Sequence, residues 1–191
     1  MSDAQNDRER AASMPEGDVV AILLEQHGRI KELFGQVKRS GGEERKDAFD
    51  ELRSLLAVHE TAEEMILRPV AADTAGEAEA DARNEEESEA NKVLAQLEKM
   101  DLDSAEFETH LARFEQAVLE HAQKEESEEF PAVRAGCSEE QLQKMGRRLL
   151  SVEKMAPTHP HPMAAGSPKA QWMTGPFASM VDRAKDALSK S

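Results

Sequence analysis

The chain has 191 residues, enough to bury one substantial core, and its length predicts a single main domain with an extension. Its 39 acidic and 24 basic residues give a formal net charge of −15, which argues against nucleic acid or an anionic membrane as a partner. Cys137 is the single cysteine, so we expect no internal disulfide and a cytoplasmic location. No apolar run approaches the roughly 20 residues that span a bilayer.

Residues 1–17 lack apolar periodicity and carry Pro and Gly, so we predict a disordered N-terminal tail. Four amphipathic helical patterns follow within residues 18–135, the first beginning at the favourable N-cap Asp18. Asp103 with Glu106 resembles a capping box that starts the fourth. Short turns near residues 41 and 102 join the helices in pairs. The fold expected is all-α: an up-down-up-down four-helix bundle.

Residues 136–191 are expected to form a C-terminal helical extension packed on the bundle. Ser138 with Gln141 resembles a further capping box, and a last amphipathic helix is predicted to begin at Pro176. His159 and His161 lie in the proline-rich stretch between these helices. We favour loop-anchoring histidines there over a substrate gate or additional metal ligands.

One motif occurs twice: His59 opens HETAEEMILRP and His121 opens HAQKEESEEFP. Each histidine is followed four residues later by a glutamate, Glu63 or Glu125, which lies on the same helical face. Each proline is predicted to end its helix at the same distance beyond the pair. In a chain this rich in glutamate, a single such pair would be expected on a solvent-exposed helix surface. The repetition favours two halves of one metal site.

Two further polar residues fall at the level of these motifs. His27 interrupts the apolar stripe of the first helix, and Glu87 takes the corresponding place in the third. At about 1.5 Å of rise per residue, both lie within about two helical turns of His59 and His121 in an antiparallel bundle. Imidazoles and carboxylates without a thiolate favour iron or manganese. The set expected to serve two carboxylate-bridged metals is His27, His59, His121, Glu63 and Glu125, joined by Glu60 or Glu87.

The alternative is that these groups satisfy one another and water without a metal. It leaves their shared level unexplained, and burying unpaired charges would cost several kcal/mol each.

These residues resemble the hemerythrin-like, HHE cation-binding proteins, which are four-helix bundles with a non-haem di-iron centre. The resemblance covers residues 18–135 and rests on LLEQH, HETAEE and HAQKEE. It implies two iron ions with oxo or hydroxo and carboxylate bridges, with manganese as the alternative. The implied histidine ligands are His27, His59 and His121, and the implied carboxylates are Glu63, Glu125 and, as in some members, Glu60.

The third helix departs from the family pattern. Its segment RNEEESEANKVL contains no histidine, and Glu87 occupies the expected position in preference to Glu86 or Ser88. A carboxylate there makes the site more anionic and disfavours reversible O₂ carriage.

The C-terminal stretches APTHPHP and TGPFASMVDRAKDAL resemble the extension of actinobacterial, including mycobacterial, members of the family. That subgroup is linked to peroxide, nitric oxide and redox stress. The resemblance therefore implies a catalase-like or peroxidase-like reaction with hydrogen peroxide, with catalytic residues unassigned. The alternative is a sensor or carrier that binds O₂, NO or iron without turnover. His110, three turns from His121, is expected to be a satisfied core histidine rather than a ligand.

Overall fold

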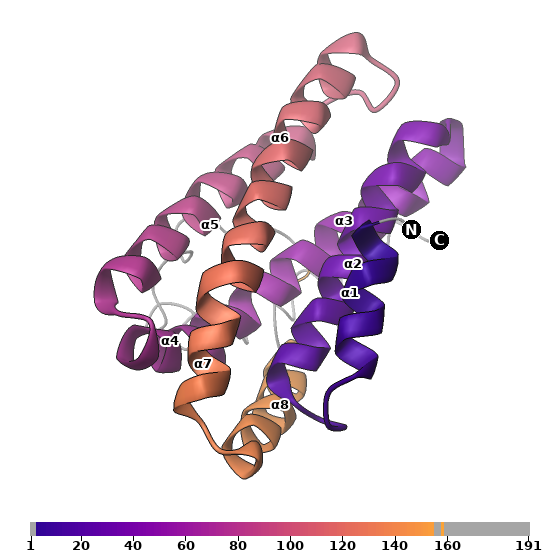
Figure 1. Cartoon of the computed structure of the whole chain (residues 1–191). Coiled ribbons are helices and arrows are strands. Elements are labelled where there is room, and N and C mark those ends of the chain that lie inside the picture. Colours follow the sequence, from indigo (N-terminus) through magenta and orange to yellow (C-terminus); the bar gives the residue numbers. More distant parts are fainter. Residues whose placement is uncertain (1–2, 155–157, 159–191) are drawn as a thin grey trace.

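The computed structural model describes residues 3–154 and residue 158, and residues 3–154 form helices joined by short turns, without a strand. Four long helices build the bundle: α2 (Val19–Arg39), α3 (Gly42–Ala62), α5 (Glu77–Leu97) and α6 (Ala105–Lys124). In Figure 1, α2 and α3 form one pair and α5 and α6 the other. The prediction of an all-α helical bundle is confirmed.

The helix starts follow local hydrogen bonding. The Asp18 carboxylate accepts from the backbone N–H of Val20, and Ser138 with Gln141 forms the predicted capping box of α8 (Glu139–Glu153). The predicted cap of α6 is one residue wrong, because Ser104 rather than Asp103 accepts from the N–H of the third helical residue.

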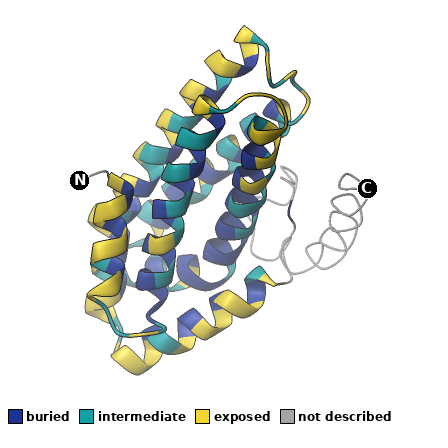
Figure 2. Ribbon diagram, turned by 90° about the vertical axis from the view of Figure 1, so that its right-hand side faces the viewer, coloured by how far each residue is buried: buried dark blue, intermediate teal, exposed yellow. Residues whose placement is uncertain are grey.

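The apolar core is divided into two clusters by a polar layer. One cluster includes Leu23, Leu67 and Phe130. The other includes Leu33 and Phe114, towards the turns that end α2 and α5. Figure 2 shows the buried faces of the helices turned inward along the whole bundle. The layer between the clusters carries buried histidines and glutamates. Because the helices pack tightly on both sides of it, these side chains are held at one level of the bundle.

The predicted N-terminal tail is wrong for residues 3–12, which form helix α1 (Asp3–Ala12) packed along α2. Its inner side carries Ala4, Asp7 and Ala11, so the pattern lacks the large apolar residues that mark a packed helix. Asp7 pairs instead with Lys31 of α2, with Nζ to Oδ2 at 2.6 Å. α1 approaches α2 closely at Gly28, where a Cβ would lie 3.1 Å from the Ala4 carbonyl oxygen.

The two prolines do not end their helices as predicted. α3 continues through a π-helical turn, η1 (Glu63–Leu67), into α4 (Arg68–Thr74), and α6 continues through η2 (Glu125–Glu129) into α7 (Phe130–Gly136). In each turn a backbone N–H reaches the carbonyl five residues earlier, from Arg68 to Glu63 and from Phe130 to Glu125. Each proline then lies in the first turn of the following helix, where its missing N–H is tolerated. Both π-turns begin at a glutamate of the repeated motif.

Helix α8 lies across the end of the bundle where α2 begins, and it contacts α2, α3 and η1 (Figure 1). It covers residues 139–153 of the predicted C-terminal extension. His159, His161 and the helix predicted from Pro176 lie outside the described residues. Within the described part of the chain, no helix is both long enough and apolar enough to cross a membrane.

Candidate metal centre

The structure brings six of the seven predicted ligands together in two groups of donor atoms. His27, His59, Glu63 and Glu125 form the first group, which we call position 1. Glu63, Glu87, His121 and Glu125 form the second, position 2. Within each group the donor atoms lie within 4.8 Å of one another. Glu63 and Glu125 belong to both groups, as expected of carboxylates that bridge two metals.

The distances show where the imidazoles face. The Nε2 atom of His59 lies 3.4 Å from Glu63 Oε2, and that of His27 lies 3.5 Å from Glu125 Oε2. The Nε2 atom of His121 lies 3.1 Å from Glu125 Oε1 and 3.8 Å from Glu87 Oε1. Each Nε2 therefore faces a carboxylate in the interior of the polar layer.

The Nδ1 atom of each histidine forms a hydrogen bond with a side chain that belongs to neither donor group. His27 Nδ1 lies 3.0 Å from Glu126, and His121 Nδ1 lies 2.9 Å from Glu86. These partners are acceptors, so Nδ1 carries the proton and donates it. The lone pair of Nε2 is then left for a metal, because the outer hydrogen bond fixes the tautomer.

His59 is held in the same way through an amide. Its Nδ1 lies 2.7 Å from Gln26 Oε1, while Gln26 Nε2 donates to Glu153 at 2.5 Å. The amide is oriented by Glu153, so its oxygen faces the imidazole and accepts the Nδ1 proton. All three histidines therefore share one tautomer.

A metal fits this layer because its inner polar atoms lack hydrogen-bond partners among the described residues. Unpartnered buried atoms include Nε2 of His27 and His121, both oxygens of Glu63, Oε2 of Glu87 and Oε2 of Glu125. Buried polar groups are almost always satisfied, and leaving one without a partner costs about 1–3 kcal/mol. Nitrogen and carboxylate donors with nothing to bind but one another are the chemistry of a site for divalent iron, manganese or zinc.

Two charged residues of the layer were not predicted from the sequence. Arg68 donates from Nη2 to Glu125 at 3.0 Å, and it also hydrogen-bonds Glu87 and, through Nη1, Glu129. Arg68 is 2% exposed and Glu129 is fully buried. Glu129 lies four residues after Glu125, and this spacing was the available signal.

Burial and neighbouring charges shift the pKa values of the carboxylates in opposite directions. Burial, followed by repulsion from Glu125, raises the pKa of Glu63 well above its usual range. Burial likewise raises the pKa of Glu87 to about 8 and that of Glu129 to about 7. Burial acts the same way on Glu125, but the nearby charges and hydrogen bonds of His121, His27 and Arg68 outweigh it and hold its pKa well below the usual range. Protons and a metal therefore compete for this layer.

Glu60 is the predicted ligand that joins neither group. Its carboxylate accepts a hydrogen bond from the Asn91 side chain and lines a cavity beside the layer. Glu86, the less favoured candidate in the third helix, instead lies behind His121. His110 is half-buried, with Nδ1 2.9 Å from the Glu106 carbonyl oxygen of its own helix, and joins neither group.

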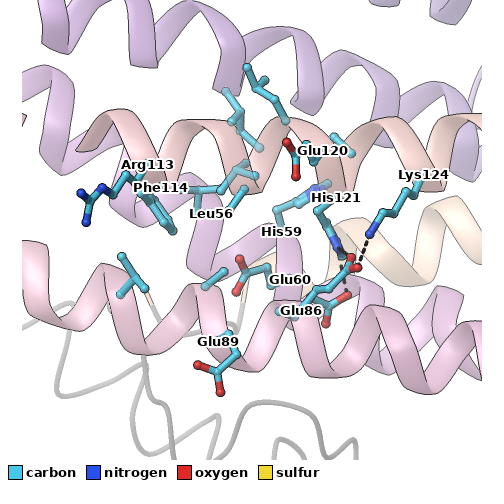
Figure 3. A pocket seen from close by; sticks show the side chains of 18 of the residues that line it. Leu56, His59, Glu60, Glu86, Glu89, Arg113, Phe114, Glu120, His121 and Lys124 are labelled. Carbon is cyan, nitrogen blue, oxygen red and sulfur yellow. Dashed lines mark hydrogen bonds and ion pairs between the residues drawn. The ribbon is translucent and has the colours of Figure 1, made fainter. Parts of the chain in front are cut away.

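The cavity has a volume of about 590 Å³ and is lined by residues of α2, α3, α5 and α6. Apolar side chains such as Leu56, Phe114 and Val118 line its body. Figure 3 shows His59, Glu60 and His121 together at this cavity. The cavity is partly open, so a small molecule can reach the histidines through it.

Comparison with known proteins identifies the family of the chain. Residues 18–133 match the family described as the hemerythrin HHE cation-binding domain. An uncharacterized hemerythrin-like protein of Schizosaccharomyces pombe is 25% identical over 138 residues, which are 71% of this chain and 68% of that protein. A DNA nickase of Nostoc sp. is 26% identical over 123 residues, 64% of this chain, and the chain spans only 35% of the nickase.

One solved structure shows the same fold. It is the crystal structure of a hemerythrin HHE cation-binding domain-containing protein from Mycobacterium kansasii, with a TM-score of 0.63 and 22% sequence identity. The similarity covers 74% of this chain and 86% of that chain.

Proposed function

Because the chain belongs to the hemerythrin HHE cation-binding domain family, we propose that its metal is iron, held as a pair of ions, and that this centre disproportionates hydrogen peroxide. Family membership and the two histidine–glutamate groups make the chain a metal-binding module. The identity and number of the ions, and the reaction, are the proposed part.

The observation that carries the proposal is the sharing of Glu63 and Glu125 between positions 1 and 2. A carboxylate with donor oxygens in two adjacent groups suits two ions bridged at short range. Both oxygens of Glu63 are buried and without a hydrogen-bond partner among the described residues, so either is free to bind an ion. The mixed nitrogen and oxygen donors favour iron or manganese over calcium or magnesium.

Peroxide suits the site better than reversible O₂ carriage. Glu87 stands where the resemblance leads one to expect a histidine, and a carboxylate favours the oxidised state of a bound ion. Iron held here would supply redox chemistry and Lewis acidity. The cavity gives a small molecule access to His59 and His121 while the apolar ends of the bundle exclude bulk water.

The reaction must move protons as well as electrons. One peroxide takes up two electrons and two protons to give two waters, and a second peroxide gives up two electrons and two protons to leave as O₂. Glu60 is placed to carry protons, because its carboxyl lines the cavity and belongs to neither donor group. Asn91 donates to Glu60 Oε2 and holds that carboxyl in place.

The direct test is O₂ evolution from peroxide by the iron-loaded full chain. We expect one O₂ for every two peroxides consumed, and each protein molecule should consume many peroxides. The matched control is the same protein loaded with zinc, which fills nitrogen and oxygen sites but has no redox chemistry. Peroxide that persists unchanged in the presence of iron-loaded protein would contradict the proposal.

A sensor is the second candidate, and contacts from the flanking helices favour it. Glu126, behind His27, pairs with Arg10 of α1 at 2.5 Å, and Gln26, behind His59, pairs with Glu153 of α8. A change at the metal would reach both helices through these contacts. A sensor should form a stable spectrum with O₂ or NO without consuming excess ligand, and should alter the protease sensitivity of residues 138–191.

A further inference from the structure

The two halves of the bundle repeat each other, but they place different side chains beside the metal layer. In the paired segments HETAEEMILRP and HAQKEESEEFP, Arg68 and Phe130 occupy the same place, directly before the proline. Phe130 stacks on His27 at position 1, with ring centroids 5.6 Å apart and planes at 20°. Arg68 instead reaches the carboxylates of position 2. The repeat therefore gives one position an aromatic ring and the other a cation.

Arg68 binds the same oxygens that face the histidine of position 2. Its Nη2 atom contacts Oε1 of Glu87 and Oε1 of Glu125. Those two atoms are also the ones that lie 3.8 Å and 3.1 Å from His121 Nε2. The guanidinium thus already neutralises the carboxylate oxygens that an ion at position 2 would bind.

Among the described residues, no arginine or lysine hydrogen-bonds the donor atoms that face position 1. The Nε2 atom of His27, both oxygens of Glu63 and Oε2 of Glu125 have no hydrogen-bond partner among the described residues. The two oxygens of Glu125 are divided accordingly, with Oε2 turned to His27 and Oε1 to His121 and Arg68. The two positions are therefore unequal before any ion binds.

We propose that Arg68 is the counter-cation of position 2, so that the first divalent ion binds between His27 and His59 and the second binds more weakly. The second ion must displace a guanidinium that is hydrogen-bonded to its carboxylate ligands, and two cations a few ångströms apart in a buried site repel strongly. Arg68 also offsets the negative charge that Glu87, unlike a neutral histidine, carries once it has lost its proton to bind an ion. The inference deepens the metal site of the proposed function and does not depend on peroxide chemistry.

The test is an anaerobic calorimetric titration of the metal-depleted full chain with Fe²⁺. The wild-type protein should show two phases, with the second ion bound roughly 10- to 100-fold more weakly than the first. In Arg68→Gln the second ion should bind at least about tenfold more tightly than in the wild type, so that the two phases approach each other. Equal affinities in the wild type, or an unchanged second phase in Arg68→Gln, would overturn the proposal.

Arg83→Gln is the matched control. Arg83 is also a buried arginine beside the layer, 4% exposed, but it pairs with Glu79 and Glu86 rather than with Glu87 or Glu125. This variant should keep both phases. If its second phase tightened as much as that of Arg68→Gln, loss of general positive charge rather than of the Arg68 contacts would be responsible, and the proposal would fail.

A second measurement uses the wild-type protein alone and does not depend on the folding of a variant. Crystals soaked with less than one equivalent of Fe²⁺ per chain should give an anomalous peak between His27 and His59. A first peak at His121 would overturn the order of filling. Failure to bind any iron would instead contradict the proposed function, so the two ideas fail separately.

Discussion

Each histidine of the centre is held from behind by a residue of different origin. Glu126 follows the ligand Glu125 on the same element, Glu86 comes from α5, and Gln26 precedes His27 on α2. Sequence spacing predicted the four-residue steps within one helix, because both members of such a pair share a face. It could not show the contacts of Arg68, because these join elements that only the fold brings together.

The first prediction concerns His59 and Glu63. His59→Ala or Glu63→Ala should lose most bound metal, because each removes a donor from a group of only four. The same variants should also lose the stabilisation that metal binding gives, about 3–4 kcal/mol when free metal exceeds Kd by a hundred- to a thousandfold. Elemental analysis and thermal melting measure the two effects. His110→Ala is the control and should keep its metal.

The second prediction separates a proton carrier from a ligand at Glu60. Glu60→Gln should keep the full metal content, because Glu60 belongs to neither donor group. It should slow O₂ evolution from peroxide by roughly 10²-fold, since an amide cannot exchange protons. Loss of metal in this variant would instead make Glu60 a ligand. Unchanged turnover would remove it from the proton path.

At the scale of elements, the π-turns η1 and η2 explain both an error and a success of sequence reasoning. Proline removes an N–H and crowds the carbonyl before it, so Pro69 and Pro131 were expected to end their helices. A turn with hydrogen bonds five residues apart relieves that conflict and lets each helix continue. The repeated position of the proline was nevertheless informative, because each proline follows closely after a π-turn whose first residue is a glutamate of the metal centre.

The third prediction concerns the packing of α8. A Cβ at Gly146 would collide with the carbonyl oxygen of Gly17, in the turn that leads into α2, and would crowd Ile22. Gly146→Ala should cost about 1–3 kcal/mol and lower the melting temperature by about 3–10 °C. Displacement of α8 should also loosen the contact from Glu153 through Gln26 to His59, so metal affinity should fall.

The control for this variant is Gly35→Ala, also inside a helix. There the added Cβ meets only the flexible end of the Arg39 side chain, at 2.8 Å. Gly35→Ala should therefore leave stability unchanged or raise it by up to about 1 kcal/mol through helix propensity. A melting temperature for Gly146→Ala equal to that of Gly35→Ala would contradict the close packing of α8.

At the scale of the whole molecule, the sequence predicted the bundle because large apolar residues recur at helical spacing in four segments. It did not predict α1, whose contact with α2 depends on small residues and on ion pairs such as that between Asp7 and Lys31. The buried face of α5 was also hard to predict from the sequence, because it carries the polar residues Arg83, Glu87 and Asn91. Hydrophobic patterning detects a packed face only where that face is apolar.

The fourth prediction is the pH dependence of the metal-free protein. The pKa values of Glu63, Glu87 and Glu129 are raised in the folded chain, to about 8 for Glu87 and about 7 for Glu129. The folded state therefore binds protons that the unfolded chain has released above its ordinary value near 4.5, so stability falls as pH rises towards 8. His27 and His121, also with raised pKa, act in the same direction above pH 6.5.

The melting temperature of the metal-depleted protein should accordingly fall between pH 6.5 and pH 8.5. His59, whose pKa is lowered to about 3, makes only a small opposing contribution in this range, because it is neutral in the folded state and the unfolded imidazole is at most about half protonated above pH 6.5. Metal affinity should rise over the same range, since binding releases protons from the layer. A melting temperature that rises with pH would show that the carboxylates do not hold protons in the fold.

The most direct test of the central claim is the iron content of the purified full chain after reconstitution with excess ferrous iron, with its absorption spectrum recorded before and after peroxide is added. We predict two irons per chain, charge-transfer absorption in the near-ultraviolet and visible range, and O₂ released as peroxide is consumed. Two irons with a lasting spectral change but no O₂ would favour the sensor. A chain that binds no iron, or zinc alone, would contradict the account.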